Sequence, residues 1–247
     1  MKTTKNTILV TGGSAGIGFE IAKLFSSHGN TVIITGRDKS RLQSAAAQLP
    51  NITPIAGDVN DPEHVEQLAQ KLEKNFPALN VIVNNAGRAA LHDLTQDNGL
   101  IEKAADEIQT NYLSIVRLNE RLLPLLKKQR DAAIVNVSSI VAFTPNHKMS
   151  TYGASKAALH SYTQSLRLAL AKNSNIKVFE VMPPLVNTEF SQAIGGANGI
   201  PASTVAEELM VAFRKDQFEL HIGKTAYIYE LNRTSPGDAL LAMNPSV

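Results

Sequence analysis

The sequence predicts a single α/β domain in which a doubly wound parallel sheet of about seven strands carries helices on both faces. Short apolar runs, such as residues 8–10, alternate along the chain with longer amphipathic stretches. Such alternation requires crossover connections, which produce parallel sheets covered on both sides. The length of 247 residues suits one domain, and 43% apolar residues are enough for a sizeable core.

The expected elements follow one another in strand–helix order. Strands are predicted at residues 7–11, 31–35, 52–56, 81–84, 133–138 and 177–182, with a seventh near 218–222. Helices are predicted at residues 16–28, 38–48, 62–75, 101–126 and 151–172. Glycines 195, 196 and 199 favour a long loop at 194–203, within a segment around 189–215 that we expect to act as a substrate loop.

A glycine-rich turn follows the first predicted strand. Gly12, Gly16 and Gly18 have the spacing Gly-x-x-x-Gly-x-Gly and open directly into the first predicted helix. Glycines permit a tight turn, and the helix amino terminus offers free N–H groups to a pyrophosphate. This context predicts a Rossmann-type dinucleotide site, with an ordinary glycine turn as the weaker alternative.

The end of the second predicted strand bears on cofactor choice. Gly36 offers no carboxylate for the ribose hydroxyls of NAD, whereas Arg37 offers a guanidinium suited to a phosphate monoester. The sequence therefore favours NADP(H), with NAD(H) as the alternative. A solvated Arg37 in a simple loop is the other interpretation, and Asp38 is expected to cap the next helix.

Tyr152 and Lys156 are four residues apart in a predicted helix and therefore share one of its faces. An ammonium near a phenol favours the phenolate and lowers its pKa. Moving that pKa from about 10 toward neutrality requires roughly 3–4 kcal/mol. The pair predicts a proton donor and acceptor for carbonyl reduction or alcohol oxidation.

These marks together resemble the short-chain dehydrogenase/reductase family over roughly residues 7–190. The resemblance also rests on Asp58-Val59, on Asn84 to Gly87, on Asn111, on Ser138-Ser139 and on Pro183 to Thr188. Two features depart from the family. Pro184 replaces the usual glycine, and the tail after Gly223 lacks the common glycine-rich ending. The Pro-Pro-Leu-Val-Asn-Thr variant at residues 183–188 is similar to a bacterial subgroup filed with D-alanyl-lipoteichoic-acid oxidoreductases.

The resemblance implies a catalytic set. Ser139 would hydrogen-bond the substrate oxygen, and Tyr152 would exchange a proton with it. Lys156 would bind the nicotinamide ribose and lower the tyrosine pKa, while Asn111 would hold a water that connects the lysine to solvent. Ser138 is the structural alternative to Ser139, because successive strand side chains face opposite sides of a sheet.

The resemblance also implies the cofactor contacts and the activity. The expected cofactor-binding residues are Gly12, Ser14, Ala15, Gly16, Ile17, Gly18, Arg37, Asp58, Val59, Asn85, Ala86, Gly87, Tyr152, Lys156, Val186 and Thr188. The expected function is an NADP(H)-dependent oxidoreductase acting on a small carbonyl or secondary alcohol, as a homodimer or homotetramer. A dehydratase or epimerase on this fold and a nucleotide-sensing regulator are the alternatives.

Composition argues against several other classes. The net charge of +2 gives no basis for nucleic-acid binding, and the absence of cysteine excludes disulfides. No apolar run suggests a membrane span or a signal peptide, so a cytoplasmic protein is expected. The six histidines show no ligand spacing, and no metal site is predicted.

Overall fold

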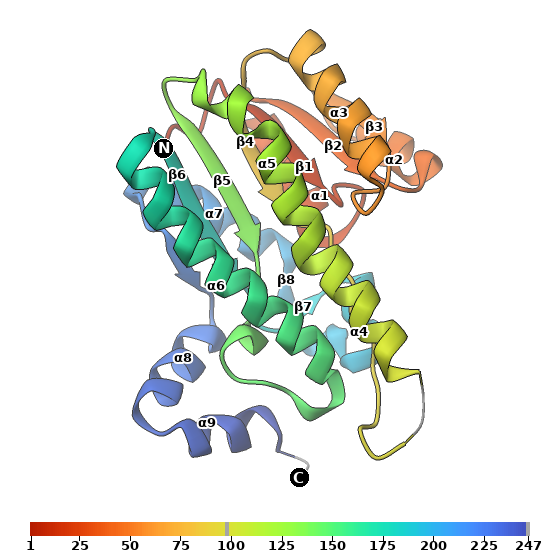
Figure 1. Ribbon diagram of the computed structural model, residues 1–247, viewed down its shortest axis with the longest axis vertical. Helices are drawn as coiled ribbons and strands as arrows, with labels where there is room; N and C mark the ends of the chain where they lie inside the picture. The colour runs from red at the N-terminus through yellow and green to blue at the C-terminus, as the bar shows by residue number, and fades with distance from the viewer. Residues whose placement is uncertain (97–98, 246–247) are drawn as a thin grey trace.

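The computed structural model describes residues 1–96 and 99–245, and its core is a seven-stranded parallel sheet (Figure 1). The strand order is β3-β2-β1-β4-β5-β6-β9, so the chain winds outward in both directions from β1 and β4. The doubly wound α/β prediction is therefore confirmed. The strands are β1 Thr7–Thr11, β2 Thr31–Gly36, β3 Ile52–Ala56, β4 Leu79–Asn84, β5 Ala132–Val137, β6 Ile176–Met182 and β9 Glu219–His221.

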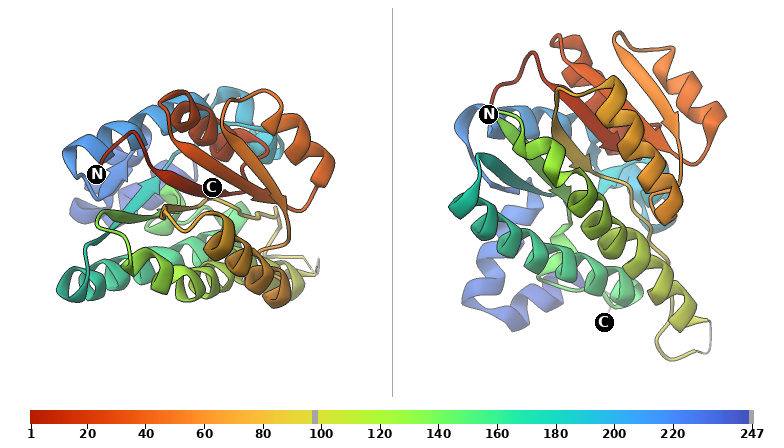
Figure 2. Two further views of the ribbon diagram at one scale, coloured as in Figure 1. Left: turned by 90° about the horizontal axis from the view of Figure 1, so that it is seen from above. Right: turned by 45° about the horizontal axis from the view of Figure 1, so that its top comes forward.

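Two helical layers enclose the sheet, as Figure 2 shows from above. One layer contains α1 Gly16–Ser27, α2 Lys39–Ala46 and α7 Ala202–Lys215, and the other contains α3 Pro62–Asn75, α5 Ser114–Lys127 and α6 Ser150–Asn173. Alternate residues of β1 enter different cores. Val10 packs in the cluster with Phe25 and Phe213, while Leu9 packs in the cluster with Leu118. Both faces of the sheet are thus buried, as parallel sheets require.

The prediction of one continuous α-helix at 101–126 is wrong, because the helix is interrupted. The chain forms α4 Leu100–Ile108, then a π-helical turn η1 Gln109–Leu113, and then α5. A π turn widens the helix locally and is frequent at functional sites. No residue in the sequence marks this π turn. Pro124, which could disturb a helix, lies well inside α5 and not at the turn.

The segment expected to be a substrate loop through residue 215 also differs. Short helices η4 Glu189–Ile194 and η5 Gly196–Asn198 follow β7 Val186–Asn187, and β7 pairs with β8 Ile200–Pro201. The rest is helix α7, which packs on α1. Val205, Leu209 and Phe213 recur at a spacing of four and form the buried side of α7. This helical period was overlooked because the nearby glycines at 195–199 suggested a loop.

The carboxy-terminal extension forms two helices that the sequence did not predict, α8 Lys224–Thr234 and α9 Pro236–Met243. They lie outside both helical layers, at the end of the sheet toward which β5 points (Figure 1). Across residues 1–96 and 99–245, no helix combines the length and the apolar character needed to cross a bilayer.

Candidate active site

A cleft of about 1470 Å³ opens at the carboxyl ends of the central strands, where open α/β sheets bind their ligands. It is larger than a usual pocket of about 300–1,000 Å³ for one small molecule. Almost all of the expected site residues line it: Gly12, Ser14, Ala15, Gly16, Ile17, Arg37, Asp58, Val59, Asn85, Ala86, Gly87, Ser139, Tyr152, Lys156, Val186 and Thr188. Gly18 and Asn111 are the two that do not.

The glycine turn is built for close approach. Gly12 and Gly16 have φ angles of 65° and 55°, a region that favours glycine. Gly18 serves packing instead, because a Cβ there would lie 2.4 Å from Asn85 Nδ2 and 2.5 Å from the Gly12 carbonyl. It lets α1 approach the end of β4, as the third glycine of such a turn usually does.

The two asparagines after β4 hold the site together. Asn85 donates from Nδ2 to the Thr11 carbonyl at 3.0 Å, which ties the glycine turn to the next strand. Asn84 donates to Asn119 Oδ1 at 3.0 Å and to Asn136 Oδ1 at 2.8 Å inside the sheet. Both asparagines therefore join neighbouring strands at this edge of the sheet, and Asn85 also lines the cleft.

The turn and the start of α1 fit a dinucleotide. Helix α1 has no side-chain cap and no acidic residue in its first turn, so its N–H groups and its positive dipole end face the cleft unopposed. At the other side, Gly36 and Arg37 line the cleft together with Arg41. Asp38 caps α2 by accepting a hydrogen bond from the Arg41 amide at 3.0 Å, as predicted.

The predicted proton-transfer group converges as expected. Tyr152 and Lys156 both lie on α6, and both are buried. The Ser139 hydroxyl lies near enough to the Tyr152 phenol to affect its pKa, and Lys156 Nζ lies 5.7 Å from the centre of the tyrosine ring. Lys156 Nζ donates to the Val137 carbonyl at 2.8 Å. Ser138 and Ser139 both line the cleft, and Ser138 Oγ donates to Glu180 Oε1 at 2.5 Å.

The expected lowering of the tyrosine pKa is not found in the protein chain by itself. Burial raises the pKa of Tyr152 to about 12, and the hydrogen bond from Ser139 opposes this only partly. Burial also lowers the pKa of Lys156 to about 8, against the charge of Glu180, which raises it. Loss of hydration therefore outweighs the neighbouring charges at both groups.

Asn111 supports the site from behind. Its Oδ1 accepts the Arg88 amide at 2.8 Å, and its Nδ2 donates to Ser155 Oγ at 2.9 Å and to the Arg88 carbonyl at 2.8 Å. A Cβ on Gly87 would lie 3.3 Å from Asn111 Oδ1 and 3.8 Å from Lys156 Nζ. Asn111 and Lys156 thus both border Gly87, and the Asn111 side chain is fully hydrogen-bonded within the protein.

Two buried carboxylates near the site, Glu107 and Glu180, were not predicted from the sequence. Glu107 accepts the Ala90 amide at 2.7 Å through Oε1, and its charge adds to the rise in the pKa of Tyr152. Glu180 lies in the middle of β6, where it binds Ser138 and His160. A charged residue inside a predicted buried strand was the signal for Glu180. Within the described residues, no group of three or more His, Cys, Asp or Glu could hold a metal.

Comparison with known proteins defines the class. The family described as short chain dehydrogenase matches residues 6–198. The chain is 41% identical over 216 residues to the uncharacterized oxidoreductase DltE of Bacillus subtilis, covering 87% of this chain and 85% of that protein. It is 31% identical over 216 residues to an uncharacterized oxidoreductase, SERP2049, of Staphylococcus epidermidis, covering 85% and 92% respectively.

Solved structures agree with the sequence relatives. A short-chain dehydrogenase from Sphingobium yanoikuyae in complex with NADPH has a TM-score of 0.81 at 27% identity, covering 94% of each chain. One from Burkholderia cenocepacia in complex with NADP has a TM-score of 0.87 at 24% identity, covering 98% of each chain, and shows the shared fold. The present chain belongs to the short-chain dehydrogenase family and is an oxidoreductase.

Proposed function

We propose that the protein is an NADP(H)-dependent oxidoreductase that interconverts a carbonyl compound and a secondary alcohol. The observation that carries this proposal is that Ser139, Tyr152 and Lys156 lie together in the same cleft as the glycine turn. A bound nicotinamide supplies or accepts the hydride. The chain itself supplies the proton and the hydrogen bonds at the substrate oxygen.

Each member of the group has a defined task. In reduction, the Tyr152 phenol gives its proton to the carbonyl oxygen, and its high pKa ensures that the proton is present at neutral pH. Ser139 donates a hydrogen bond to the same oxygen and orients it toward the phenol. Lys156, fixed by the Val137 carbonyl, places a positive charge where the phenolate forms. Asn111 positions the helix that carries both groups by bonding to Ser155.

The preference for NADP(H) is proposed from Arg37. Arg37 directly follows β2 and lines the cleft, and Gly36 at the end of that strand offers no carboxylate to the ribose. A structural neighbour from Burkholderia phymatum is in complex with NAD, so the fold accommodates either cofactor. We further propose a cytoplasmic homo-oligomer that takes small-molecule substrates.

The decisive experiment follows NADPH oxidation against a panel of aldehydes and ketones in the wild type and in Tyr152→Phe. This substitution removes one hydroxyl and keeps the ring, so we expect intact folding and cofactor binding but a loss of kcat of at least about 100-fold. Tyr112→Phe makes the same chemical change outside the cleft and should leave turnover unchanged. Near-normal turnover in Tyr152→Phe would refute the proton-donor role.

The same assay separates the alternatives. A nucleotide-sensing regulator would bind NADPH without consuming it on any substrate. A dehydratase or epimerase would convert its substrate without net oxidation of NADPH. Only a reductase couples NADPH loss to alcohol formation in a one-to-one ratio and depends on Tyr152.

A further inference from the structure

The catalytic tyrosine shares an apolar cluster with the carboxy-terminal extension. Tyr152, Val141 and Met149 pack in one cluster with Ile228 of α8, and Met243 at the end of α9 packs against that cluster. The extension lies beyond residues 6–198, the part of the chain that matches the family. The substrate side of the cleft is therefore bounded by a segment to which the family resemblance assigns no role.

A hydrogen-bonded clamp fixes this extension in place. Asn244 is 7% exposed, and its Nδ2 donates to the Pro145 carbonyl at 3.0 Å and to the Leu240 carbonyl at 2.7 Å. Its Oδ1 accepts the His147 amide at 2.9 Å. Asn146 Nδ2 donates in return to the Met243 carbonyl at 3.0 Å. The tail is thus held from both sides against the loop between β5 and α6.

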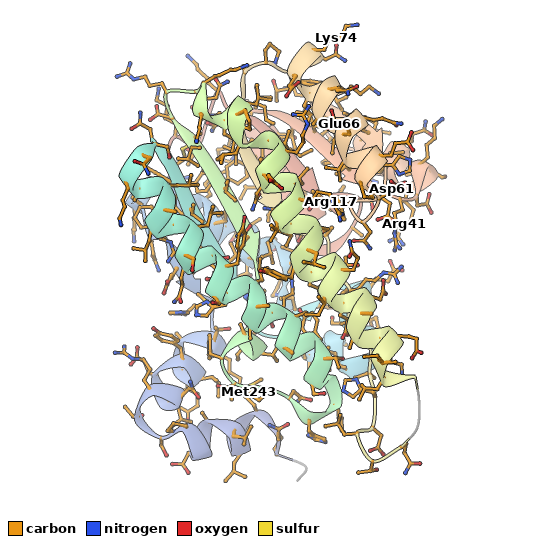
Figure 3. All side chains as sticks on the ribbon, viewed as in Figure 1. Arg41, Asp61, Glu66, Lys74, Arg117 and Met243 are labelled. Carbon is orange, nitrogen blue, oxygen red and sulfur yellow. The ribbon has the colours of Figure 1, made fainter. Side chains whose placement is uncertain are left out.

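The clamp places two apolar side chains at the cleft. Met243 and Pro245, on either side of Asn244, both line it. Figure 3 labels Met243 beside the loop that leads into α6. Both Oδ1 and Nδ2 of Asn244 are hydrogen-bonded to the protein, so its neighbours Met243 and Pro245 are held in fixed positions along the cleft.

The other walls of the cleft carry exposed apolar side chains. Leu91 is 39% exposed, Phe190 is 52% exposed and Ile194 is 37% exposed, and all three line the cleft. The Phe190 ring lies 6.2 Å from the Tyr152 ring. Apolar side chains gathered around a concave site indicate a surface that a ligand covers.

Charge in this region does not favour an anionic substrate. Arg88 lines the cleft but is paired with Asp106. Lys148 also lines it, on an exposed part of the loop that precedes α6. Ile140, Val141 and Met149 pack with Tyr152 in one apolar cluster.

We propose that Met243 and Pro245, together with Leu91, Phe190 and Ile194, form a subsite for the apolar body of the substrate. The substrate class is then a ketone, or the matching secondary alcohol, that carries an alkyl or aryl group of several carbons. This inference rests on the proposed function in one point, namely that the reacting group of the substrate is a carbonyl. The subsite itself is defined by its walls.

The test is a homologous series of straight-chain methyl ketones from butanone to nonanone. Dissociation constants are measured by calorimetry in the presence of NADP⁺, which cannot reduce a ketone, and kcat/KM is measured separately with NADPH. Each added methylene that the subsite buries should tighten binding about fourfold. In Met243→Ala this gain should fall to about twofold or less for the longer ketones, because the wall that buries them is shortened.

Two further variants complete the design. Asn244→Ala removes the clamp and should reduce the gain in binding for each added methylene, as Met243→Ala does. If Asn244→Ala folds poorly, Met243→Ala still tests the subsite. Leu241→Ala is the matched control, because Leu241 lies on the same helix, is 61% exposed and does not line the cleft. It should keep the wild-type gain for each methylene.

Each outcome is decisive. A wild-type series without chain-length dependence, or an unchanged series in Met243→Ala, overturns the subsite. Tight binding only of carboxylate-bearing ketones, lost in Lys148→Ala, also overturns it. If binding follows the expected series but no ketone is reduced, the subsite stands and the proposed function fails. If short ketones are reduced without any gain with length, the function stands and the subsite fails.

Discussion

Arg41 and Glu189 form an ion pair that joins two walls of the cleft, with Arg41 Nη2 2.6 Å from Glu189 Oε2. Arg41 lies on α2 next to the predicted 2′-phosphate site, and Glu189 begins η4, which leads into the apolar wall. Figure 3 labels Arg41 on the side of the molecule where α2 lies. The carboxylate of Glu189 also holds the pKa of Arg41 above its ordinary value.

This pair predicts competition between Glu189 and a phosphate for the same guanidinium. Glu189→Gln should tighten NADP(H) binding and leave NAD(H) binding unchanged. Both side chains are exposed, so the gain should stay below about fivefold, as for surface ion pairs. Fluorescence titration of NADPH and NADH with the two proteins measures it. An equal change for both cofactors would show that Arg41 does not meet the phosphate.

Arg37 should contribute more. Arg37→Ala removes a charge-assisted bond to the 2′-phosphate, so NADP(H) binding should weaken by about 1–3 kcal/mol while NAD(H) binding stays the same. Lys39→Ala, which removes a basic residue at the start of α2 outside the cleft lining, is the control. Equal affinities of the wild type for NADP and NAD would disprove the preference.

The features that depend on the spacing of nearby residues were the ones that could be predicted from the sequence. The glycine turn and the Tyr152–Lys156 pair each lie within one element or one connection, so a helix or turn period suffices to place them. The seven strands were found for the same reason. In contrast, the π turn at Asn111 has no residue that marks it, and its place became visible only in the structure.

Long-range packing could not be obtained from spacing. The clamp joins Asn244 to Pro145, which are 99 residues apart, and Glu180 meets Ser138 across 42 residues. The sign of the tyrosine pKa shift was missed for a related reason. The sequence shows the neighbouring ammonium of Lys156 but not the degree of burial, and burial dominates.

The proposed oligomer makes a prediction about α4, α5 and α6. Ile101 of α4, Leu113 of η1 and Leu168 of α6 are 74%, 42% and 69% exposed, which suits a surface covered by a second copy. Light scattering at micromolar concentration should give at least the mass of a dimer. Leu168→Glu should shift it toward the monomer, and a wild-type monomer would reject the prediction.

The segment from Glu189 to Val205 is expected to close over bound ligand. Pro184 fixes its own φ near −65° and has no N–H, so the chain leaves β6 in a defined direction. Movement should then concentrate near Gly195, whose φ of 80° suits a hinge. Hydrogen exchange with and without NADP(H) should show added protection at 189–205. Unchanged protection throughout this segment would exclude closure.

The buried ammonium of Lys156 should reduce the stability of the fold at neutral pH. Burial lowers its pKa from 10.5 to about 8, so the folded state binds protons less readily than the unfolded state between these values. The unfavourable contribution is full below about pH 8 and is relieved as the pH rises toward about 10. Lys156→Met should therefore stabilise the protein at about pH 7 by about 2 kcal/mol, after allowing for the lost bond to Val137.

Urea unfolding of the wild type and Lys156→Met at about pH 7 and about pH 10 provides the measurement, and the difference in stability should shrink at the higher pH.

Glu180→Gln tests the influence of the neighbouring carboxylate on Lys156. Its carboxylate holds the Lys156 pKa up and, by hydrogen bonding, raises the pKa of His160. The raised His160 pKa stabilises the fold fully below about pH 6.5 and less as the pH rises through the folded value. Glu180→Gln should thus destabilise more at about pH 6 than at about pH 9, and ¹³C NMR of the lysine side chain should show Lys156 titrating lower than in the wild type. An unchanged Lys156 titration would show that Glu180 acts only through packing.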